Sequence, residues 1–94
     1  MKNQSMGLMR FEAENADLSN ANFAGADLSH ALLRFANLRH ADFTNADIRD
    51  AEFDGADLSG ARFAGARAEG ARFAGATLTG ATGIDTADGM VVAQ

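Results

Sequence analysis

The sequence predicts an all-β solenoid in which four short sides make up each coil. Three observations predict it: a five-residue alanine repeat, large apolar residues at a fixed place within that repeat, and opposite charges twenty residues apart. The composition agrees, because 21 of the 94 residues are alanine and few large apolar side chains are left for a conventional core. A repeated geometry, rather than bulk burial, must therefore organise the chain.

Alanine recurs fourteen times in succession at a spacing of five, from Ala16 to Ala81. Two residues after each alanine except the last stands a central residue, and twelve of these thirteen centres are large and apolar. Ala68 is the exception and leaves one centre underfilled. The twelve large centres are the expected structural core: Leu18, Phe23, Leu28, Leu33, Leu38, Phe43, Ile48, Phe53, Leu58, Phe63, Phe73 and Leu78.

A period of five fits neither a continuous helix nor a flat strand. On an α-helix five residues advance by about 500°, so successive repeats would drift around the cylinder. On a strand they would alternate between the two faces, because side chains there have a period of two. The period instead predicts a coil that turns a corner every five residues.

The charges indicate how many corners each coil has. In stacked coils, residues one turn apart lie about 4.8 Å from each other, so opposite charges should face each other at the true spacing. A spacing of twenty gives six opposite pairs and one like pair, whereas fifteen gives four opposite and five like pairs. Four sides are therefore favoured. The six opposite pairs are Glu14 with Arg34, Arg34 with Asp54, Asp42 with Arg62, Asp47 with Arg67, Arg49 with Glu69, and Glu52 with Arg72.

The run from Ala16-Asp17-Leu18-Ser19-Asn20 through Ala26-Asp27-Leu28-Ser29-His30 resembles the pentapeptide-repeat family. That family's pattern is Ala, then Asp or Asn, then Leu or Phe, then two variable residues, and it is followed here from 16 to 80. The resemblance implies a right-handed, four-sided (quadrilateral) parallel β-helix. Thirteen clear units, with two degenerate ones at 6–10 and 11–15, make about 3.75 coils of twenty residues. We expect a disordered N-terminal segment at 1–5, the β-helix at 6–82 and a cap or tail at 83–94.

Some residues depart from the repeat. Leu32 and Phe35 are apolar at outward positions of one coil, and we expect them to form an exposed apolar contact spot. Phe11 and Ala13 exchange the usual small and large residues, which predicts a cap or a distorted coil near the N-terminus. The last apolar residues are expected to cap the coil or to contact a second subunit: Met90, Val91 and Val92.

The residues with reactive side chains do not form a catalytic pattern. The regular aspartates follow from the repeat, and His30 and His40 lie ten residues apart, hence on opposite sides of the coil. No serine stands with a histidine and an acid in an activating pattern, and cysteine is absent. We therefore expect no enzyme, no catalytic residue, no cofactor and no metal site. Three arginines that could suggest a phosphate patch diverge around one coil: Arg62, Arg67 and Arg72.

These observations favour a non-catalytic structural or protein-interaction scaffold whose partner is unknown. The alternative, implied by the family resemblance, is a DNA-mimicking binder of DNA gyrase or topoisomerase. The net charge of −5 makes direct nucleic-acid binding improbable, and no apolar run is long enough to span a membrane. We further expect a cytoplasmic location and a homodimer through the coil ends, where backbone donors and acceptors lack partners.

Overall fold

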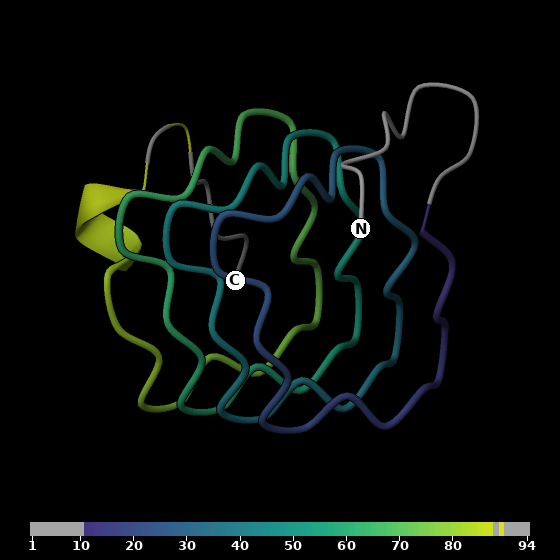
Figure 1. Cartoon of the computed structure of the whole chain (residues 1–94). Helices are drawn as coiled ribbons and strands as arrows, with labels where there is room; N and C mark the ends of the chain where they lie inside the picture. The colour runs from purple at the N-terminus through teal and green to yellow at the C-terminus, as the bar shows by residue number, and fades with distance from the viewer. Residues whose placement is uncertain (1–10, 88, 90–94) are drawn as a thin grey trace.

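The structure, a computed structural model, describes residues 11–87 and residue 89. Within this part of the chain, parallel β-bridges join residues that lie twenty apart, from Glu12 with Leu32 to Arg62 with Thr82. Four five-residue units thus make one coil, and successive coils stack in parallel (Figure 1). The bridges are isolated contacts at the second residue of each unit, counted from its alanine. The described residues form no strand longer than a single bridge.

Each corner of the coil is a turn at the fourth and fifth residues of a unit. The alanine amide that opens the next unit donates a hydrogen bond to the carbonyl of the preceding centre, as Ala16 N does to Ala13 O at 3.1 Å. The fifth residue has a positive φ, for example 64° at Asn20 and 70° at Gly25. This left-handed backbone turns the chain, and glycine and asparagine adopt it at the lowest cost.

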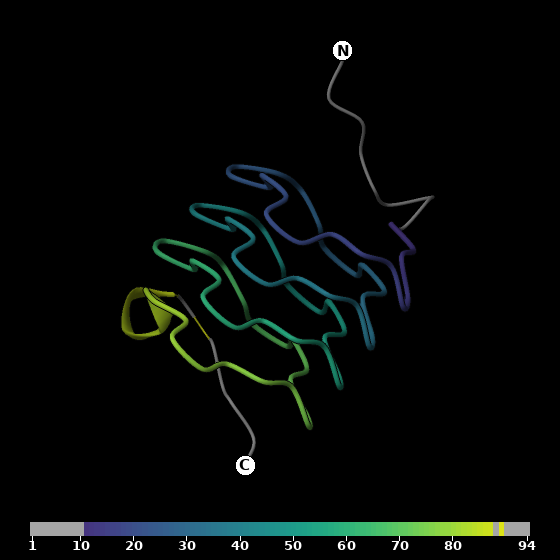
Figure 2. The same ribbon diagram turned by 90° about the horizontal axis from the view of Figure 1, so that it is seen from below.

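Neighbouring coils are joined by three backbone hydrogen bonds per unit. The amide of Leu18 donates to Asn37 O at 2.7 Å, and Asn20 N donates to Arg39 O at 2.8 Å. In the other direction Asn37 N donates to Ala16 O at 2.9 Å. Because the same three bonds recur wall after wall, the coils are held in one register without any regular helix or long strand. Figure 2 shows the coils one behind the other in an open stack of rungs.

The core lies inside the coils and consists of alanines and large apolar centres. Of the twelve expected core residues, nine are buried, while Leu18, Phe23 and Leu78 are half-buried and pack against the others. Rings stack along a wall at centroid distances of 5.2 Å for Phe43 with Phe63 and 5.0 Å for Phe53 with Phe73. Across the coil the contacts are edge-to-face. The alternation of alanine and a large residue is what lets four walls close around so narrow an axis.

Of the two expectations for the N-terminal coil, a distorted coil is wrong for the residues that the structure describes, and a cap stays a prediction. Glu12 forms the regular parallel bridge with Leu32, and Leu32 N donates to Phe11 O at 2.7 Å. The ring of Phe11 meets the edge of Phe23 at a centroid distance of 6.1 Å. The larger residue at the alanine position is therefore accommodated by a ring contact at the end of the core, and the backbone pattern stays intact.

At the other end the repeat gives way to a single 3-10 turn, η1, at Ile84–Thr86. Gly83 precedes it with a φ of 78°, and a Cβ there would collide with the backbone nitrogen of Ala64. Gly83 thus lies directly against the backbone of the preceding coil. Residues 1–10, and with them the expected 1–5 segment and the first unit of the 3.75 coils, lie outside the described residues, as do Met90, Val91 and Val92. No helix in the described part of the chain is long and apolar enough to cross a membrane.

Candidate protein-contact surface

Most of the regular aspartates are engaged in holding the turns. At the second position of a unit, the Oδ1 atom of Asp17 accepts hydrogen bonds from the amide of Ser19 at 3.2 Å and from its hydroxyl at 2.8 Å. Asp42 with Thr44 and Asp57 with Ser59 repeat this pattern. These side-chain and backbone hydrogen bonds lower the pKa of Asp17, Asp42 and Asp57 below the ordinary aspartate value. Their carboxylates are structural groups of the corner and not free acids or bases.

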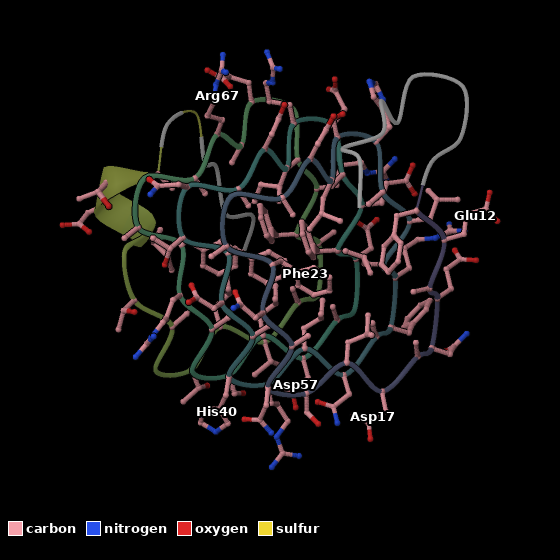
Figure 3. All side chains as sticks on the ribbon, viewed as in Figure 1. Glu12, Asp17, Phe23, His40, Asp57 and Arg67 are labelled. Carbon is pink, nitrogen blue, oxygen red and sulfur yellow. The ribbon has the colours of Figure 1, made fainter. Side chains whose placement is uncertain are left out.

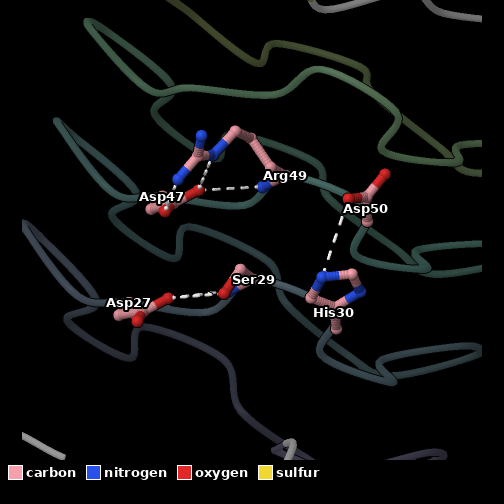
Figure 4. Close-up of polar contacts among 6 residues, drawn as sticks. All are labelled: Asp27, Ser29, His30, Asp47, Arg49 and Asp50. Atoms are coloured by element: carbon pink, nitrogen blue, oxygen red, sulfur yellow. Dashed lines mark hydrogen bonds and ion pairs between the residues drawn. The ribbon is translucent and has the colours of Figure 1, made fainter. Parts of the chain in front are cut away.

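The like-charged pair Asp27 and Asp47 shows the same preference for local partners. Their backbones form one parallel bridge, yet Asp27 accepts from the Ser29 hydroxyl at 2.7 Å, while Asp47 binds the guanidinium of Arg49 (Figure 4). The contact between Arg49 Nη2 and Asp47 Oδ2 is 2.8 Å. The Arg49 hydrogen bond lowers the pKa of Asp47, and Asp47 raises the pKa of Arg49. Repulsion between the stacked carboxylates is therefore relieved within each turn.

The expected ion pairs form in part and exchange partners in part. Arg34 binds Glu14 and Arg62 Nη1 lies 3.8 Å from Asp42 Oδ2, both as expected from the twenty-residue spacing. Arg34 also pairs with Glu52 instead of the expected Asp54, since Glu52 Oε1 lies 3.6 Å from Arg34 Nε. On the same wall, Arg72 binds Asp54 at 3.1 Å instead of Glu52. On the preceding wall, Arg49 binds Asp47, and the expected pairs of Arg49 with Glu69 and of Asp47 with Arg67 do not form among the described residues.

The histidines and arginines do not converge. His30 Nε2 lies 3.7 Å from Asp50 Oδ2, a surface pair that the spacing predicts (Figure 4). His40 lies on a separate corner, and Arg67 lies on the far side of the molecule from it (Figure 3). Among residues 11–87, no group of three or more histidines and acids is close enough to hold a metal ion. The described surface thus brings no set of reactive groups to one point.

One wall carries both apolar departures from the repeat. We call it the Leu32–Phe35 wall and define it by four second-position residues joined by parallel bridges and by the corner that follows them. Phe35 is 63% exposed, whereas Leu32 is half-buried, so the expected exposed spot is carried mainly by the ring. The wall's second-position residues are Glu12, Leu32, Glu52 and Arg72, and its corner residues are 14–15, 34–35, 54–55 and 74–75.

Phe35 also has an unusual backbone. Its φ is 63°, in the left-handed region, where a bulky side chain costs about 1–2 kcal/mol relative to glycine. Among residues 11–87, the other non-glycine residues with positive φ are asparagine, histidine or aspartate, whose short polar side chains tolerate this region better. An exposed aromatic ring held on a strained backbone is the feature of the described surface that the repeat does not explain.

The corner columns reveal an arrangement that the sequence analysis missed. The side chains at the four corners of the second described coil, residues 31–50, lie against glycines of the third coil, residues 51–70. A Cβ built on Gly55 would lie 2.5 Å from Phe35 Cδ1, and one on Gly60 would lie 2.5 Å from His40 Nδ1. The twenty-residue spacing of these positions could have revealed the pairing. The pairs are Phe35 with Gly55, His40 with Gly60, Asn45 with Gly65, and Asp50 with Gly70.

One oxygen of this wall is buried without a partner. Asp54 Oδ1 accepts no hydrogen bond among the described residues, while Asp54 Oδ2 receives Arg72 Nη2 at 3.1 Å. The Asp54 side chain is mostly covered, and that of Arg72 is 63% exposed. Arg72 is therefore the cation that compensates Asp54, and it stays accessible from outside.

The family model described as "Pentapeptide repeat region" matches residues 6–82. The chain belongs to the pentapeptide-repeat family. The match spans the whole coil described above and agrees with the parallel bridges at a spacing of twenty. Among curated proteins, none matches the chain in sequence.

Three solved structures of pentapeptide-repeat proteins are similar to the chain. One from the Arabidopsis thaliana thylakoid lumen is 28% identical, with a TM-score of 0.49, over 85% of this chain and 67% of its own length. One from the cyanobacterium Cyanothece is 28% identical, with a TM-score of 0.41, over 74% of this chain and 58% of its own. HetL from Nostoc, described as involved in heterocyst differentiation regulation, is 33% identical, with a TM-score of 0.30, over 74% of this chain and 37% of its own.

Proposed function

We propose that this pentapeptide-repeat chain is a non-catalytic protein-interaction scaffold, a right-handed β-helix of about 3.75 coils, whose Leu32–Phe35 wall binds a protein. The observation that carries the proposal is Phe35, 63% exposed at a positive φ of 63°. Such a residue costs stability at its own corner, and glycine or asparagine would fit there without strain. Aromatic side chains are enriched among the residues that dominate protein interfaces, so binding of a protein would account for an exposed ring at this corner.

The surroundings of Phe35 support binding of a protein in preference to a small molecule. Its ring lies on Gly55 and is 63% exposed, and the half-buried Leu32 lies on the same wall, so the apolar area is exposed on the outside of the coil. Small-molecule sites are usually concave and bury most of the ligand. Charged side chains surround the spot, as Arg34 lies between Glu14 and Glu52. An apolar centre with a charged rim is the usual anatomy of a protein contact surface.

The experiment is an affinity capture with a matched pair of variants. In the first variant Leu32→Asp and Phe35→Asp remove the apolar spot, and we expect loss of the partners that the native protein retains from a lysate of its source. In the control, Asn37→Asp and Asn45→Asp add the same charge at equivalent positions of other walls. Circular dichroism verifies that both variants keep the fold. Equal capture by the native protein and the first variant would refute the proposed surface.

A DNA-mimicking gyrase binder is the weaker alternative. It is favoured by the net charge of −5, but arginines interrupt three of the four acidic columns, at Arg62, Arg67 and Arg72. Duplex DNA carries about one charge per 1.7 Å of its axis, and no wall of the described coil approaches that density. A DNA supercoiling assay with purified gyrase discriminates between the two proposals. Inhibition at micromolar protein that survives the Leu32→Asp and Phe35→Asp changes would favour the mimic.

A further inference from the structure

The height of the Phe35 ring on its wall is well defined. Phe35 belongs to the second described coil, residues 31–50, and its ring lies against Gly55 of the third coil, residues 51–70. The exposed apolar group of the wall is thus located between the second and third of four coils. This is the middle of the wall in the described part of the chain.

The charges of the same wall alternate from coil to coil. The first coil contributes Glu12 and Glu14, the second contributes Arg34, the third contributes Glu52 and Asp54, and the fourth contributes Arg72. Acidic and basic coils therefore take turns along the wall, and the two outermost coils carry opposite charge. The pattern changes sign when the wall is turned upside down about its middle.

These two observations define the same axis. If a second copy is placed against the wall, upside down, a two-fold axis between the second and third coils brings Arg72 of each copy towards Glu12 and Glu14 of the other. The same axis brings each Arg34 towards the acidic third coil of the other copy. Phe35 lies at the corner of the wall and at the height of this axis, so the two Phe35 rings face each other across it. All the contacts form twice, as an isologous interface requires.

We propose that the partner of the Leu32–Phe35 wall is a second copy of this chain, bound side by side and antiparallel. The inference rests on the proposed function, because it names an occupant for the same surface. A parallel pairing of this wall would place each acidic coil against an acidic coil, and like charges across an interface are costly. An end-to-end pairing through the coil ends would leave Phe35 exposed.

The contact is expected to be weak and sensitive to salt. Its apolar centre consists of Leu32 and Phe35 from each copy, which is small beside the area that stable interfaces bury. The charged contacts lie at the rim, where ions screen them. We therefore expect a monomer in dilute solution and a dimer as the concentration rises towards about 1 mM at low salt.

Sedimentation equilibrium of charge-exchanged variants tests the proposed geometry. Arg72→Glu alone should weaken self-association about tenfold or more, and Glu12→Arg with Glu14→Arg should do the same, because each creates like-charge contacts in both halves of the dimer. Mixing the two variants should restore association. The carboxylate introduced in the first variant then meets the two guanidinium groups introduced in the second, while the other half of the mixed dimer keeps its native charges. Arg62→Glu, at a similarly exposed arginine of another wall, is the matched control and should leave self-association unchanged.

A second variant keeps the test decisive if Arg72→Glu disturbs the fold through Asp54. Phe35→Asn places at this corner the residue type that Asn15 already has one coil earlier, and it should weaken self-association about tenfold or more. His40→Asn at the next corner is its control. A monomer at all concentrations would overturn the dimer while leaving capture of another protein through Phe35 possible. The side-by-side dimer would also be overturned if the dimer persisted in Phe35→Asn and if mixing the two charge-exchanged variants did not strengthen association. Pairing through the coil ends would then be favoured.

Discussion

The phenyl ring of Phe35 lies against Gly55, which occupies the same corner one coil later. Gly55 has a φ of 70°, so two separate constraints exclude a side chain from this position: the left-handed backbone and the space already filled by the ring. The two constraints can be separated because Gly25 has the same φ of 70°, and no described residue lies within 4 Å of the place where its Cβ would be.

Gly55→Ala is expected to destabilise the protein more than Gly25→Ala. Both glycines have a φ of 70°, so both changes incur about 1–2 kcal/mol of backbone strain. Only Gly55 has a ring where its Cβ would be, which adds about 1 kcal/mol of overpacking. Urea unfolding of the two variants measures the difference. Adding Phe35→Gly to Gly55→Ala should remove the excess, and an equal loss in both single variants would contradict the packing account.

Phe35→Asn is expected to raise the free energy of unfolding by about 0.5 kcal/mol. Asparagine tolerates the left-handed region better than phenylalanine, and the ring loses little packing because it is 63% exposed. Thermal melts of the native protein and the variant provide the comparison. A lower melting temperature for the variant would mean that the ring stabilises the fold, and the argument that it serves binding would lose its basis.

Stability should decline as the pH falls below about 4, through the aspartates that hold the turns. Folding lowers the pKa of Asp17, Asp42 and Asp57, so their contribution is present above the unfolded pKa and is lost as the pH falls through the lower folded pKa. Replacing all three by asparagine should flatten this dependence, since Asn22 and Asn37 make the same turn bond to the backbone. Unfolding measured at about pH 7 and about pH 3 tests it. An undiminished pH dependence in the triple variant would exclude these carboxylates as its source.

Phe53→Ala should cost about 3–5 kcal/mol, as expected for a buried aromatic side chain. Phe53 is fully buried and contacts Phe73 at a centroid distance of 5.0 Å and Phe43 at 5.6 Å. Phe23→Ala is the natural comparison, because that half-buried ring lies near the N-terminal end of the core and should cost less. Denaturant unfolding measures both. Equal losses would indicate that the end of the described coil is as tightly packed as its middle.

The sequence by itself predicted the architecture because the repeat imposes it locally. Every fifth residue is a small alanine, and its partner two residues later is large, so Ala56 and Leu58 are directed inward whatever lies above or below them. The charges favoured stacking at a spacing of twenty, which gives six opposite pairs and one like pair, and Glu14 with Arg34 is one of the pairs that form. The alternation of Asp and Ser or Thr within a unit likewise encodes the turn bonds of Asp57 with Ser59.

The candidate site depended on tertiary structure. From the repeat, Leu32 and Phe35 are both outward, but the coil half-buries Leu32 and leaves Phe35 exposed. The positive φ at each corner aims the fifth side chain at the next coil, which is why Phe35 rests on Gly55. Likewise Arg72 pairs with Asp54 instead of Glu52, because side chains two residues apart in the same wall compete for one cation.

The five-residue period therefore determined which residues face inward and how far apart stacked neighbours lie, because both follow from the covalent spacing of the repeat. Only the tertiary structure decided which outward side chain stays exposed, at what height on the wall, and beside which charges. Those properties arise where two coils meet, and the distances between side chains of adjacent coils are set by the corner geometry and not by the order of residues along the chain.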